Sequence, residues 1–466
     1  MKYDYDLICI GLGPAGMAIS LMGDAMGLKV LAIEKHRIGG ECMNVGCIPS
    51  KSILRYAKRV KTAQDLLGAF PNGVGTPFEK IQKHLQFIGD KKTKNLFDNV
   101  PVIFGKASFV DAHTITVNGE NKSAKRIFIA TGTRPALPKI AGADSVSFLT
   151  NETIFNLERV PASMIILGGG AIACEMAQAF ARLGTKITLV QRSAHILSKM
   201  DAAAAEIVET KFRAEGINLL TGTLAKSVRM LDGNVELTTD KGEIIVAEKI
   251  LAAAGRAFDF SELKLENAGV KIDEKRGNIC VNKYLQTSQK NIFAVGDCNG
   301  HHLFSHAAMH QGMIALMNAM MPFPFKINFQ KFVVPATMFT EPQVSEVGAR
   351  ERDLRERQVK FETIICNYGD YGAAIAEEVA DGFIKVFVGR TGKILGAVIV
   401  GEGSGEMINE WALAVQKKLH ITSILFLQHS FPTMGFLSKR IAETWTMGKM
   451  KSNFLKKLCR FFFRLG

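Results

Sequence analysis

The sequence predicts an α/β protein with two Rossmann-like nucleotide-binding domains. Two observations predict this fold: residues 6–16 and residues 163–173 each place a glycine turn between an apolar strand and a helix. The length of 466 residues leaves room for roughly three domains of ordinary size. Because 47% of the residues are hydrophobic and 22% are charged, the chain can bury several cores.

The first glycine turn has the complete setting of a dinucleotide cradle. The segment DLICIGLGPAG holds Gly11, Gly13 and Gly16, and the next apolar strand, KVLAI, ends at Glu34. In such a unit the first glycine makes the tight turn, the second admits a pyrophosphate, and the third lets helix and strand pack closely. The acid accepts a hydrogen bond from a ribose hydroxyl. We therefore predict a dinucleotide site here, and the alternative is an ordinary glycine-rich turn.

The second glycine turn repeats the pattern. The segment SMIILGGGAIA supplies Gly168, Gly170 and Ala173, and a helical stretch and the strand KITLV follow it. Two such units indicate two nucleotides, for which a flavin and a nicotinamide dinucleotide are the usual pair. The second strand ends in Gln191 and Arg192 where an NAD site often has an acid, and an arginine can pair with a 2′-phosphate. We predict a modest preference for NADPH, unless Arg192 is only a solvated surface charge.

Two cysteines lie close together in IGGECMNVGCIPSK, residues 38–51. Cys42 and Cys47 are five positions apart, an axial rise of about 7.5 Å in a regular helix, whereas bridged cysteines need Cα atoms within roughly 7 Å. A bond between them therefore requires an irregular entry to the helix. A position near a helix N-terminus and beside Lys51 lowers a thiol pKa and makes a reactive thiolate. The alternatives are two unrelated structural thiols or a metal pair, although nothing nearby completes a ligand set.

Composition and charge exclude several classes of protein. No apolar run reaches the roughly 18–20 residues needed to span a membrane, and residues 1–10 lack the apolar core of a secretory signal. We therefore expect a cytoplasmic protein, in which a disulfide is usually catalytic or redox-sensing. The net charge is +14, but no nucleic-acid-binding motif is present, so we expect no nucleic-acid partner.

Much of the positive charge lies at the C-terminus. Residues 449–466 carry six Lys or Arg and no acid, which leaves +8 for the other 448 residues. On a helix, the apolar side chains of this tail share one side and the cations surround the flank; the apolar residues are Phe454, Leu458, Phe461, Phe462 and Leu465. A basic amphipathic helix is typical of a peripheral membrane element or a docking helix. The alternative is a helix packed on its own dimer.

Several motifs carry a resemblance to a known family. GGECMNVGCIPSK resembles the redox-disulfide signature of the class I pyridine nucleotide–disulfide oxidoreductases, such as dihydrolipoamide dehydrogenase, glutathione reductase and mercuric reductase. The resemblance covers the chain from about residue 5 to about residue 445. Four further stretches resemble family motifs: RIFIATGTRP (126–135), ILAAAGRAF (250–258), NIFAVGDC (291–298) and FTEPQVSEVG (339–348).

The resemblance implies two Rossmann-like nucleotide-binding domains plus a C-terminal α+β dimerisation domain. The implied segments are an FAD-binding domain at 1–150 and 259–330, an NAD(P)-binding domain at 151–258, an interface domain at 331–446 and the basic tail at 447–466. The interface domain would build a homodimer. The implied cofactors are FAD and NADPH or NADH.

The resemblance also implies residue roles. Cys47 would lie against the flavin, Cys42 would exchange with substrate, and Lys51 would lie beside flavin N5, paired with Glu175. Asp297 would hold the ribityl chain. The predicted cofactor-binding residues are Gly11, Gly13, Gly16, Glu34, Glu41, Lys51, Ala107, Thr131, Gly132, Asp297 and Ser305 for the flavin, and Gly168, Gly170, Ile172, Glu175, Gln191, Arg192 and Gly255 for the nicotinamide dinucleotide.

The chain departs from the family at one segment. Disulfide-reducing members have a His-Pro-Thr segment whose histidine is the acid–base group of the other subunit, with a glutamate five residues later. Here HSFPTMGF at 429–436 places Phe431 and Phe436 at those two positions. Phenylalanine carries no proton, and general acid–base help is typically worth about 10²–10⁴-fold. His429, two residues earlier, is a candidate substitute.

Three functions therefore stay open for the predicted enzyme. The first is NAD(P)H-dependent reduction of a disulfide-type acceptor, small molecule or small protein, through a redox-active Cys42–Cys47 disulfide. The second is mercuric-reductase-like reduction of a metal ion or quinone. The third is a flavin-binding scaffold or redox sensor with little turnover. The histidines of HHLFSHAAMHQ include an i, i+4 pair, His306 and His310, but no third ligand is identifiable, so we predict no resident metal site.

Overall fold

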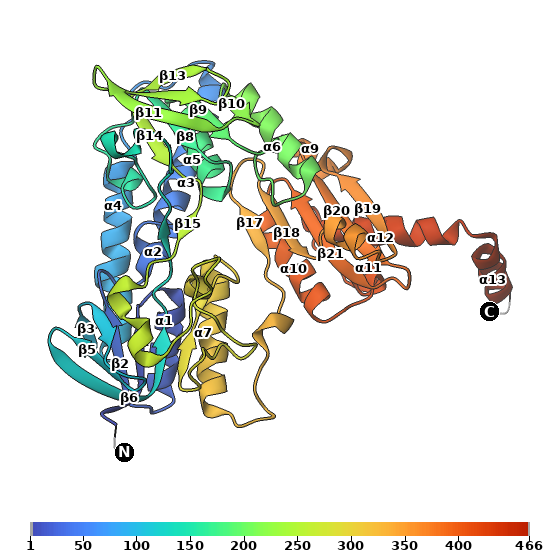
Figure 1. The fold of residues 1–466 in the computed structure, drawn as a ribbon. Coiled ribbons are helices and arrows are strands. Elements are labelled where there is room, and N and C mark those ends of the chain that lie inside the picture. The colour runs from blue at the N-terminus through green and yellow to red at the C-terminus, as the bar shows by residue number, and fades with distance from the viewer. Residues whose placement is uncertain (1–2, 465–466) are drawn as a thin grey trace. The chain divides into compact units, whose positions relative to one another are not determined.

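The computed structural model of the chain describes residues 3–464, without the side chains of residues 90–92 (Figure 1). The chain forms two compact units. The first unit combines the residues up to 192 with residues 223–331, and the second combines residues 193–222 with the residues from 332 onward. Within the described residues, no helix is both long and apolar enough to cross a membrane.

The first unit contains a seven-stranded sheet with the order β3-β2-β1-β6-β5-β4, in which β16 also pairs with β6. The strands β3, β2, β1, β6 and β16 run parallel, and the last two strands of the order continue antiparallel. β1 and β2 are almost entirely buried, as expected of parallel strands covered on both faces. The strands are β1 (Tyr5–Ile10), β2 (Val30–Glu34), β3 (Val102–Phe104), β4 (Ala107–Phe109), β5 (Thr114–Val117), β6 (Glu120–Ile129) and β16 (Ile292–Ala294).

The described part of the first unit contains five α-helices besides α5 (Ala171–Arg182). α1 begins directly after the first glycine turn and packs against α7. α3 begins at the second cysteine and packs against both α4 and α5. The helices are α1 (Pro14–Ala25), α2 (Gly40–Asn44), α3 (Cys47–Leu67), α4 (Phe78–Gln86) and α7 (Ser305–Met320).

The second glycine turn belongs to another parallel sheet of the first unit. β14 pairs with β8 and β8 with β9, all parallel, and α5 follows the turn after β8. A three-stranded antiparallel sheet, β11-β12-β13, and a short β7–β15 ladder complete this part. The elements are β7 (Arg134–Pro135), β8 (Ser163–Leu167), α5 (Ala171–Arg182), β9 (Lys186–Gln191), β11 (Ala225–Leu231), β12 (Asn234–Thr239), β13 (Ile244–Ala247), β14 (Lys249–Ala252) and β15 (Arg256–Ala257).

The second unit is built on a five-stranded antiparallel sheet with the order β17-β18-β21-β20-β19. Its core surrounds Trp411, which is fully buried and donates a hydrogen bond from Nε1 to Ser438 Oγ at 3.2 Å. The elements are α6 (Ala202–Ala214), β10 (Asn218–Thr221), β17 (Ala336–Met338), β18 (Val344–Gly348), α8 (Glu351–Glu356), β19 (Phe361–Asn367), α9 (Gly372–Ala376), β20 (Phe383–Gly389), β21 (Ile394–Val400), α10 (Ser404–Gln416), α11 (Ile421–Phe426), α12 (Phe436–Met450) and α13 (Asn453–Phe463).

These elements confirm the predicted fold class. Both glycine turns join a buried parallel strand to a helix, as a Rossmann-like unit requires. The C-terminal part mixes an antiparallel sheet with helices, as expected of an α+β domain.

Candidate functional site

The two cysteines lie on either side of a break between two helices. Cys42 is the third residue of α2, which ends at Asn44, and Cys47 is the first residue of α3. The irregular entry expected from their spacing is therefore present. Both side chains are half-buried free thiols.

The surroundings of the pair favour a single thiolate on Cys47. Its Sγ lies 3.3 Å from the Oγ of Ser305, the first residue of α7. A hydrogen bond from Cys42, a second from Ser305 and the charge of Lys51 lower the pKa of Cys47 to about 6. The same hydrogen bond to Cys47, together with burial, raises the pKa of Cys42. At neutral pH the reduced pair therefore holds one negative charge on Cys47 and one proton on Cys42.

An ion pair lies one helical turn beyond Cys47. Lys51 Nζ donates to Glu175 Oε2 at 2.8 Å, which joins α3 to α5. The Glu175 side chain is 6% exposed and that of Lys51 is 37% exposed. A carboxylate this deeply buried is costly without a cationic partner, and Lys51 supplies one. The structure thus brings the four predicted catalytic residues of α2, α3 and α5 together, although their catalytic roles stay predictions.

A hydrogen-bonded network that the sequence did not reveal lies beside α2. Arg256 pairs with Glu41 through Nη2, and its Nη1 donates to Asn151 Oδ1 at 3.3 Å. Asn151 Nδ2 in turn donates to the backbone carbonyl of Val45 at 3.2 Å, two residues before Cys47. The only sequence signal was the position of Arg256 directly after the predicted Gly255, because its partners lie 105 and 215 positions away. This network fixes the break that carries the cysteines.

The network continues to the predicted ribityl-binding residue. Arg256 Nε donates to Thr133 Oγ1 at 2.9 Å, and Thr133 Oγ1 lies 3.5 Å from Asp297 Oδ2. Burial raises the pKa of Asp297 to about 6, despite the opposing effect of Arg256. A half-buried carboxyl group with one long hydrogen bond can accept further hydrogen bonds, so it fits a partner that donates from hydroxyl groups.

In the first glycine turn, two positions have no space for a side chain, whereas the third has space. A Cβ on Gly11 would lie 2.6 Å from the carbonyl oxygen of Ala130, and one on Gly16 would lie 1.9 Å from that of Gly11. Gly11 also has φ +95°. A Cβ on Gly13 would meet nothing within 4 Å, and Gly13 is the N-cap of α1. Space kept at a helix N-terminus fits the close approach of a pyrophosphate, as a flavin dinucleotide would require.

Besides the predicted ribose contact, Glu34 stabilises the backbone of the first glycine turn. Its buried carboxylate accepts a hydrogen bond from Leu12 N and another from His36 N, both at 2.7 Å. These bonds hold the glycine turn at the end of β1. The ribose contact stays a prediction, since each carboxylate oxygen has further acceptor capacity.

The other predicted flavin-site residues occupy separate elements of the first unit. Ala107 is buried at the start of β4. Thr131 and Gly132 follow β6, and the Cα of Thr131 borders the glycine turn. These positions, with the open Gly13 and the half-buried Asp297, fit an extended dinucleotide.

In the second glycine turn, too, one glycine position has no space for a side chain and another has space. Gly168 has φ +116°, and a Cβ there would lie 2.4 Å from the carbonyl oxygen of Ala253, whereas a Cβ on Gly170 would meet nothing within 4 Å. Ile172, in the first turn of α5, is 38% exposed. Gly255 has φ +159° and lies between β14 and β15. The turn therefore leaves room for a second dinucleotide.

Gln191 ends β9 and Arg192 follows it, and their two side chains have different surroundings. Gln191 is buried against the glycine turn, where a Cβ on Gly169 would lie 2.9 Å from its side chain. Arg192 is exposed, and no carboxylate of the described residues forms an ion pair with it. A free guanidinium at this position fits a 2′-phosphate.

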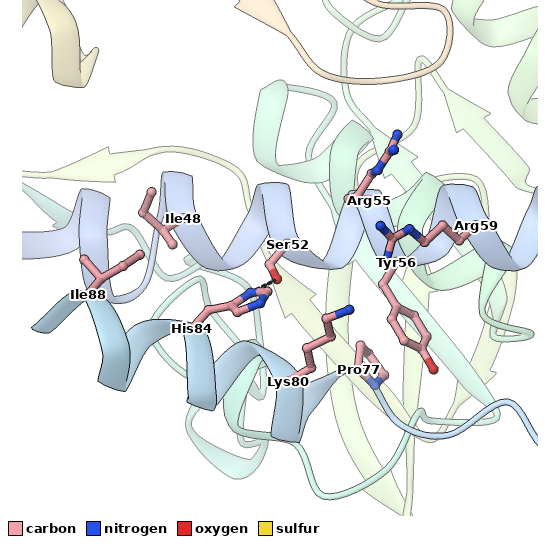
Figure 2. Close-up of a pocket in the computed structure, with 9 residues that line it drawn as sticks. All are labelled: Ile48, Ser52, Arg55, Tyr56, Arg59, Pro77, Lys80, His84 and Ile88. Carbon is pink, nitrogen blue, oxygen red and sulfur yellow. Dashed lines mark hydrogen bonds between the residues drawn. The ribbon is translucent and has the colours of Figure 1, made fainter. Parts of the chain in front are cut away.

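A cavity of about 400 Å³ lies on another face of α3, between this helix and α4. Figure 2 shows the hydrogen bond between Ser52 Oγ and His84 Nδ1, 3.0 Å long, that crosses from one helix to the other. The cavity includes Ile48, which follows Cys47, but none of the predicted site residues. Its lining residues are Ile48, Ser52, Arg55, Tyr56, Arg59, Pro77, Lys80, His84 and Ile88.

The segment that departs from the family pattern lies in the second unit. Phe431 is 71% exposed, and its ring lies 5.2 Å from that of Phe436 in an edge-to-face arrangement. His429 Nε2 lies 3.0 Å from Glu410 Oε1, and the histidine side chain is 8% exposed. Among the described residues, no group of three or more His, Cys, Asp or Glu could hold a metal ion.

Comparisons with known proteins agree on one family. The family model described as pyridine nucleotide-disulphide oxidoreductase matches residues 5–312, and the model of its dimerisation domain matches residues 334–439. Mercuric reductase of Staphylococcus aureus is 33% identical over 433 residues, which cover 90% of this chain and 79% of that protein. Dihydrolipoyl dehydrogenase of Geobacillus stearothermophilus is 31% identical over 454 residues, covering 94% of this chain and 95% of that protein.

Solved structures give a similar result. The HOCl-induced flavoprotein disulfide reductase RclA from Escherichia coli superposes with a TM-score of 0.86 and 26% identity, covering 94% of this chain and 99% of that chain. A Cu(II) complex of the same reductase superposes with a TM-score of 0.84 and 25% identity, covering 93% and 98%.

The thiolate prediction can be tested by alkylation. In the reduced protein, iodoacetamide should modify Cys47 at neutral pH, and the rate should fall as the pH drops through about 6, because the thiolate is then protonated. Lys51→Met should shift this midpoint upward and Glu175→Gln downward, since the two charges act in opposite directions on the pKa of Cys47. Peptide mass spectrometry across the pH series measures both shifts. Equal midpoints in all three proteins would contradict the assignment.

The second glycine turn offers a matched pair of substitutions. Gly168→Ala should lower the free energy of unfolding by at least about 1–3 kcal/mol, because φ +116° and a backbone clash oppose any side chain. Gly170→Ala should leave stability within about 0.5 kcal/mol of the native chain. It should instead raise the KM for NAD(P)H about tenfold, through one lost close contact to the pyrophosphate. Thermal unfolding and steady-state kinetics distinguish the two, and an unstable Gly170→Ala protein would contradict this division.

Proposed function

Because the chain belongs to the pyridine nucleotide–disulphide oxidoreductase family, whose members use FAD and NAD(P)H, we propose that it passes electrons from NAD(P)H through Cys42 and Cys47 to a soft metal ion. The chain is an oxidoreductase, and its dimerisation domain indicates a homodimer. In this proposal residues 1–150 and 259–330 hold FAD, residues 151–258 hold NAD(P)H and residues 331–446 form the dimer interface.

The redox pair has the local chemistry that electron storage requires. Bound FAD would supply the two-electron link between the nicotinamide and the disulfide. When the disulfide accepts two electrons and one proton, the bond between Cys42 and Cys47 breaks, Cys42 takes the proton and Cys47 leaves as a thiolate. Hydrogen bonds from Cys42 and Ser305 and the charge of Lys51 stabilise that thiolate. Cys42 keeps its proton until an acceptor binds, so near neutral pH the reduced pair holds one thiol and one thiolate.

The observation that carries the choice of acceptor is Phe431 at the position of the acid–base group. Reduction of a disulfide acceptor releases a thiolate that must be protonated, and a phenylalanine side chain provides no proton. A soft metal ion bound by two cysteine sulfurs needs no proton there. One NAD(P)H supplies two electrons, which reduce one Hg(II) to Hg(0) or two Cu(II) to Cu(I) with release of one proton. The similarity to mercuric reductase and to a reductase solved as a Cu(II) complex supports this class of acceptor.

A second candidate acceptor is a small disulfide, and one contact in the second unit favours it. His429 is nearly buried and lies 3.0 Å from Glu410, so a carboxylate orients this imidazole. A histidine held in this way is suited to proton transfer. His429 would then replace the missing histidine from a position two residues earlier in the chain.

A comparison of acceptors separates the candidates. Anaerobic NADPH oxidation should be fastest with Hg(II) or Cu(II), slow with lipoamide and glutathione disulfide, and absent in Cys42→Ser. The double substitution Phe431→His with Phe436→Glu should raise disulfide reduction about 10²–10⁴-fold, the usual worth of general acid–base help. Disulfide reduction that exceeds metal reduction and disappears in His429→Gln would overturn the proposal in favour of the second candidate. No turnover with any metal ion, quinone or disulfide would indicate a scaffold or redox sensor.

Coenzyme preference gives an independent test of the second nucleotide site. We propose that Arg192 pairs with the 2′-phosphate of NADPH and that Gln191 replaces the acid of an NAD site. Arg192→Ala should lower kcat/KM for NADPH about tenfold or more, the loss of one charge-assisted contact, and leave NADH almost unchanged. A native enzyme with a higher kcat/KM for NADH than for NADPH would contradict this assignment.

A further inference from the structure

The last helix of the chain contacts α12 but buries none of its own residues. α13 follows α12 after a break at residues 451–452, and none of its 11 residues is buried. Phe454 is 72% exposed, Phe462 61% and Phe463 90%. Large apolar side chains gathered on one exposed element mark an interaction surface rather than ordinary surface composition.

Most side chains of α13 divide into two faces, and Phe463 lies outside the apolar stripe, beside Lys456. With 100° per residue, Phe454, Leu458 and Phe462 form one stripe at i, i+4 and i+8, and Leu455 and Phe461 border it. The cations fall within about 100° on the opposite side; they are Lys456, Lys457, Arg460 and Arg464. Leu465, which the sequence also placed on the apolar side, lies outside the described residues.

The charge of this helix has one sign only. Residues 453–464 contain no Asp or Glu, and no carboxylate of the described residues pairs with a cation of α13. By contrast, Lys449 at the end of α12 pairs with Glu362. The three cations of α13 and Arg464, which follows it, are therefore available to an external partner that carries negative charge.

We propose that α13 lies on the surface of an anionic lipid bilayer. Its apolar stripe would enter the boundary of the acyl chains while its cations contact the phosphates of the head groups. A helix of 11 residues is about 16 Å long, too short for a hydrocarbon core of about 30 Å, so it lies in the interface and does not span it. A second copy of α13 is a poorer partner, because it would cover the apolar stripe but supply no negative charge to the cations on the opposite side.

Vesicle flotation of the full-length holoenzyme tests the proposal. The protein should float with phosphatidylcholine vesicles that contain phosphatidylglycerol, and should not float with pure phosphatidylcholine vesicles. Two triple variants should each bind at least tenfold less: Phe454→Ser/Leu458→Ser/Phe462→Ser and Lys456→Glu/Lys457→Glu/Arg460→Glu. High salt should weaken binding, since the Debye length falls from about 10 Å at 0.1 M to about 3 Å at 1 M.

A matched control makes the same change of charge elsewhere. Lys125, Lys275 and Lys290 are exposed and have no ion pair among the described residues, so their triple substitution by Glu should leave flotation unchanged. NADPH oxidation by every variant checks that the first unit is folded. Deletion of residues 452–466 should abolish flotation without loss of that activity.

Three outcomes would overturn the proposal. The native protein could fail to float with anionic vesicles, or the control triple variant could lose as much binding as the α13 variants. Alternatively, the α13 variants could change the mass found by sedimentation equilibrium while flotation stays the same. The last result would assign α13 to packing on a second copy of the chain.

Discussion

The ion pair between Lys51 and Glu175 is the contact on which the redox site depends. Lys51 lies on the helix that Cys47 begins, and Glu175 lies on the helix that follows the second glycine turn, 124 positions away in the chain. The pair therefore fixes the thiol helix to the nucleotide cradle that precedes α5. It also places a positive charge beside Cys47, where that charge stabilises a thiolate. Loss of Lys51 would leave the deeply buried Glu175 carboxylate without a cationic partner.

The Arg256 network supplies the second constraint. One guanidinium joins Glu41 of the cysteine-bearing α2 to Asn151 and Thr133, and through Thr133 it reaches the neighbourhood of Asp297. The residues that would hold the flavin chain and those that carry the cysteines thus share one rigid set of hydrogen bonds. This sharing explains how a pair of thiols at a break between two helices can keep a defined position.

Local signals in the sequence predicted much of the fold and of the site. The two glycine turns fixed the strand–helix units, and the spacing of Cys42 and Cys47 required the break that separates α2 from α3. Contacts between segments that are distant in the chain could not be predicted from such local signals. Neither the Arg256 network nor the dual use of Glu34 can be inferred from spacing, because both depend on which loops the sheets bring together. The electron acceptor was not predictable either, because Phe431 shows that an acid–base group is missing but does not indicate which acceptor is used instead.

In the proposed mechanism, NAD(P)H drives Cys42 and Cys47 from a disulfide to a dithiol. The most direct test counts reactive thiols in the air-oxidised holoenzyme before and after one equivalent of NADPH under anaerobic conditions. The expected result is two additional thiols per protomer in the native protein, mapped by mass spectrometry to Cys42 and Cys47, and none in Cys42→Ser. An unchanged thiol count, with NADPH consumed, would contradict the claim, because electrons would then bypass the pair.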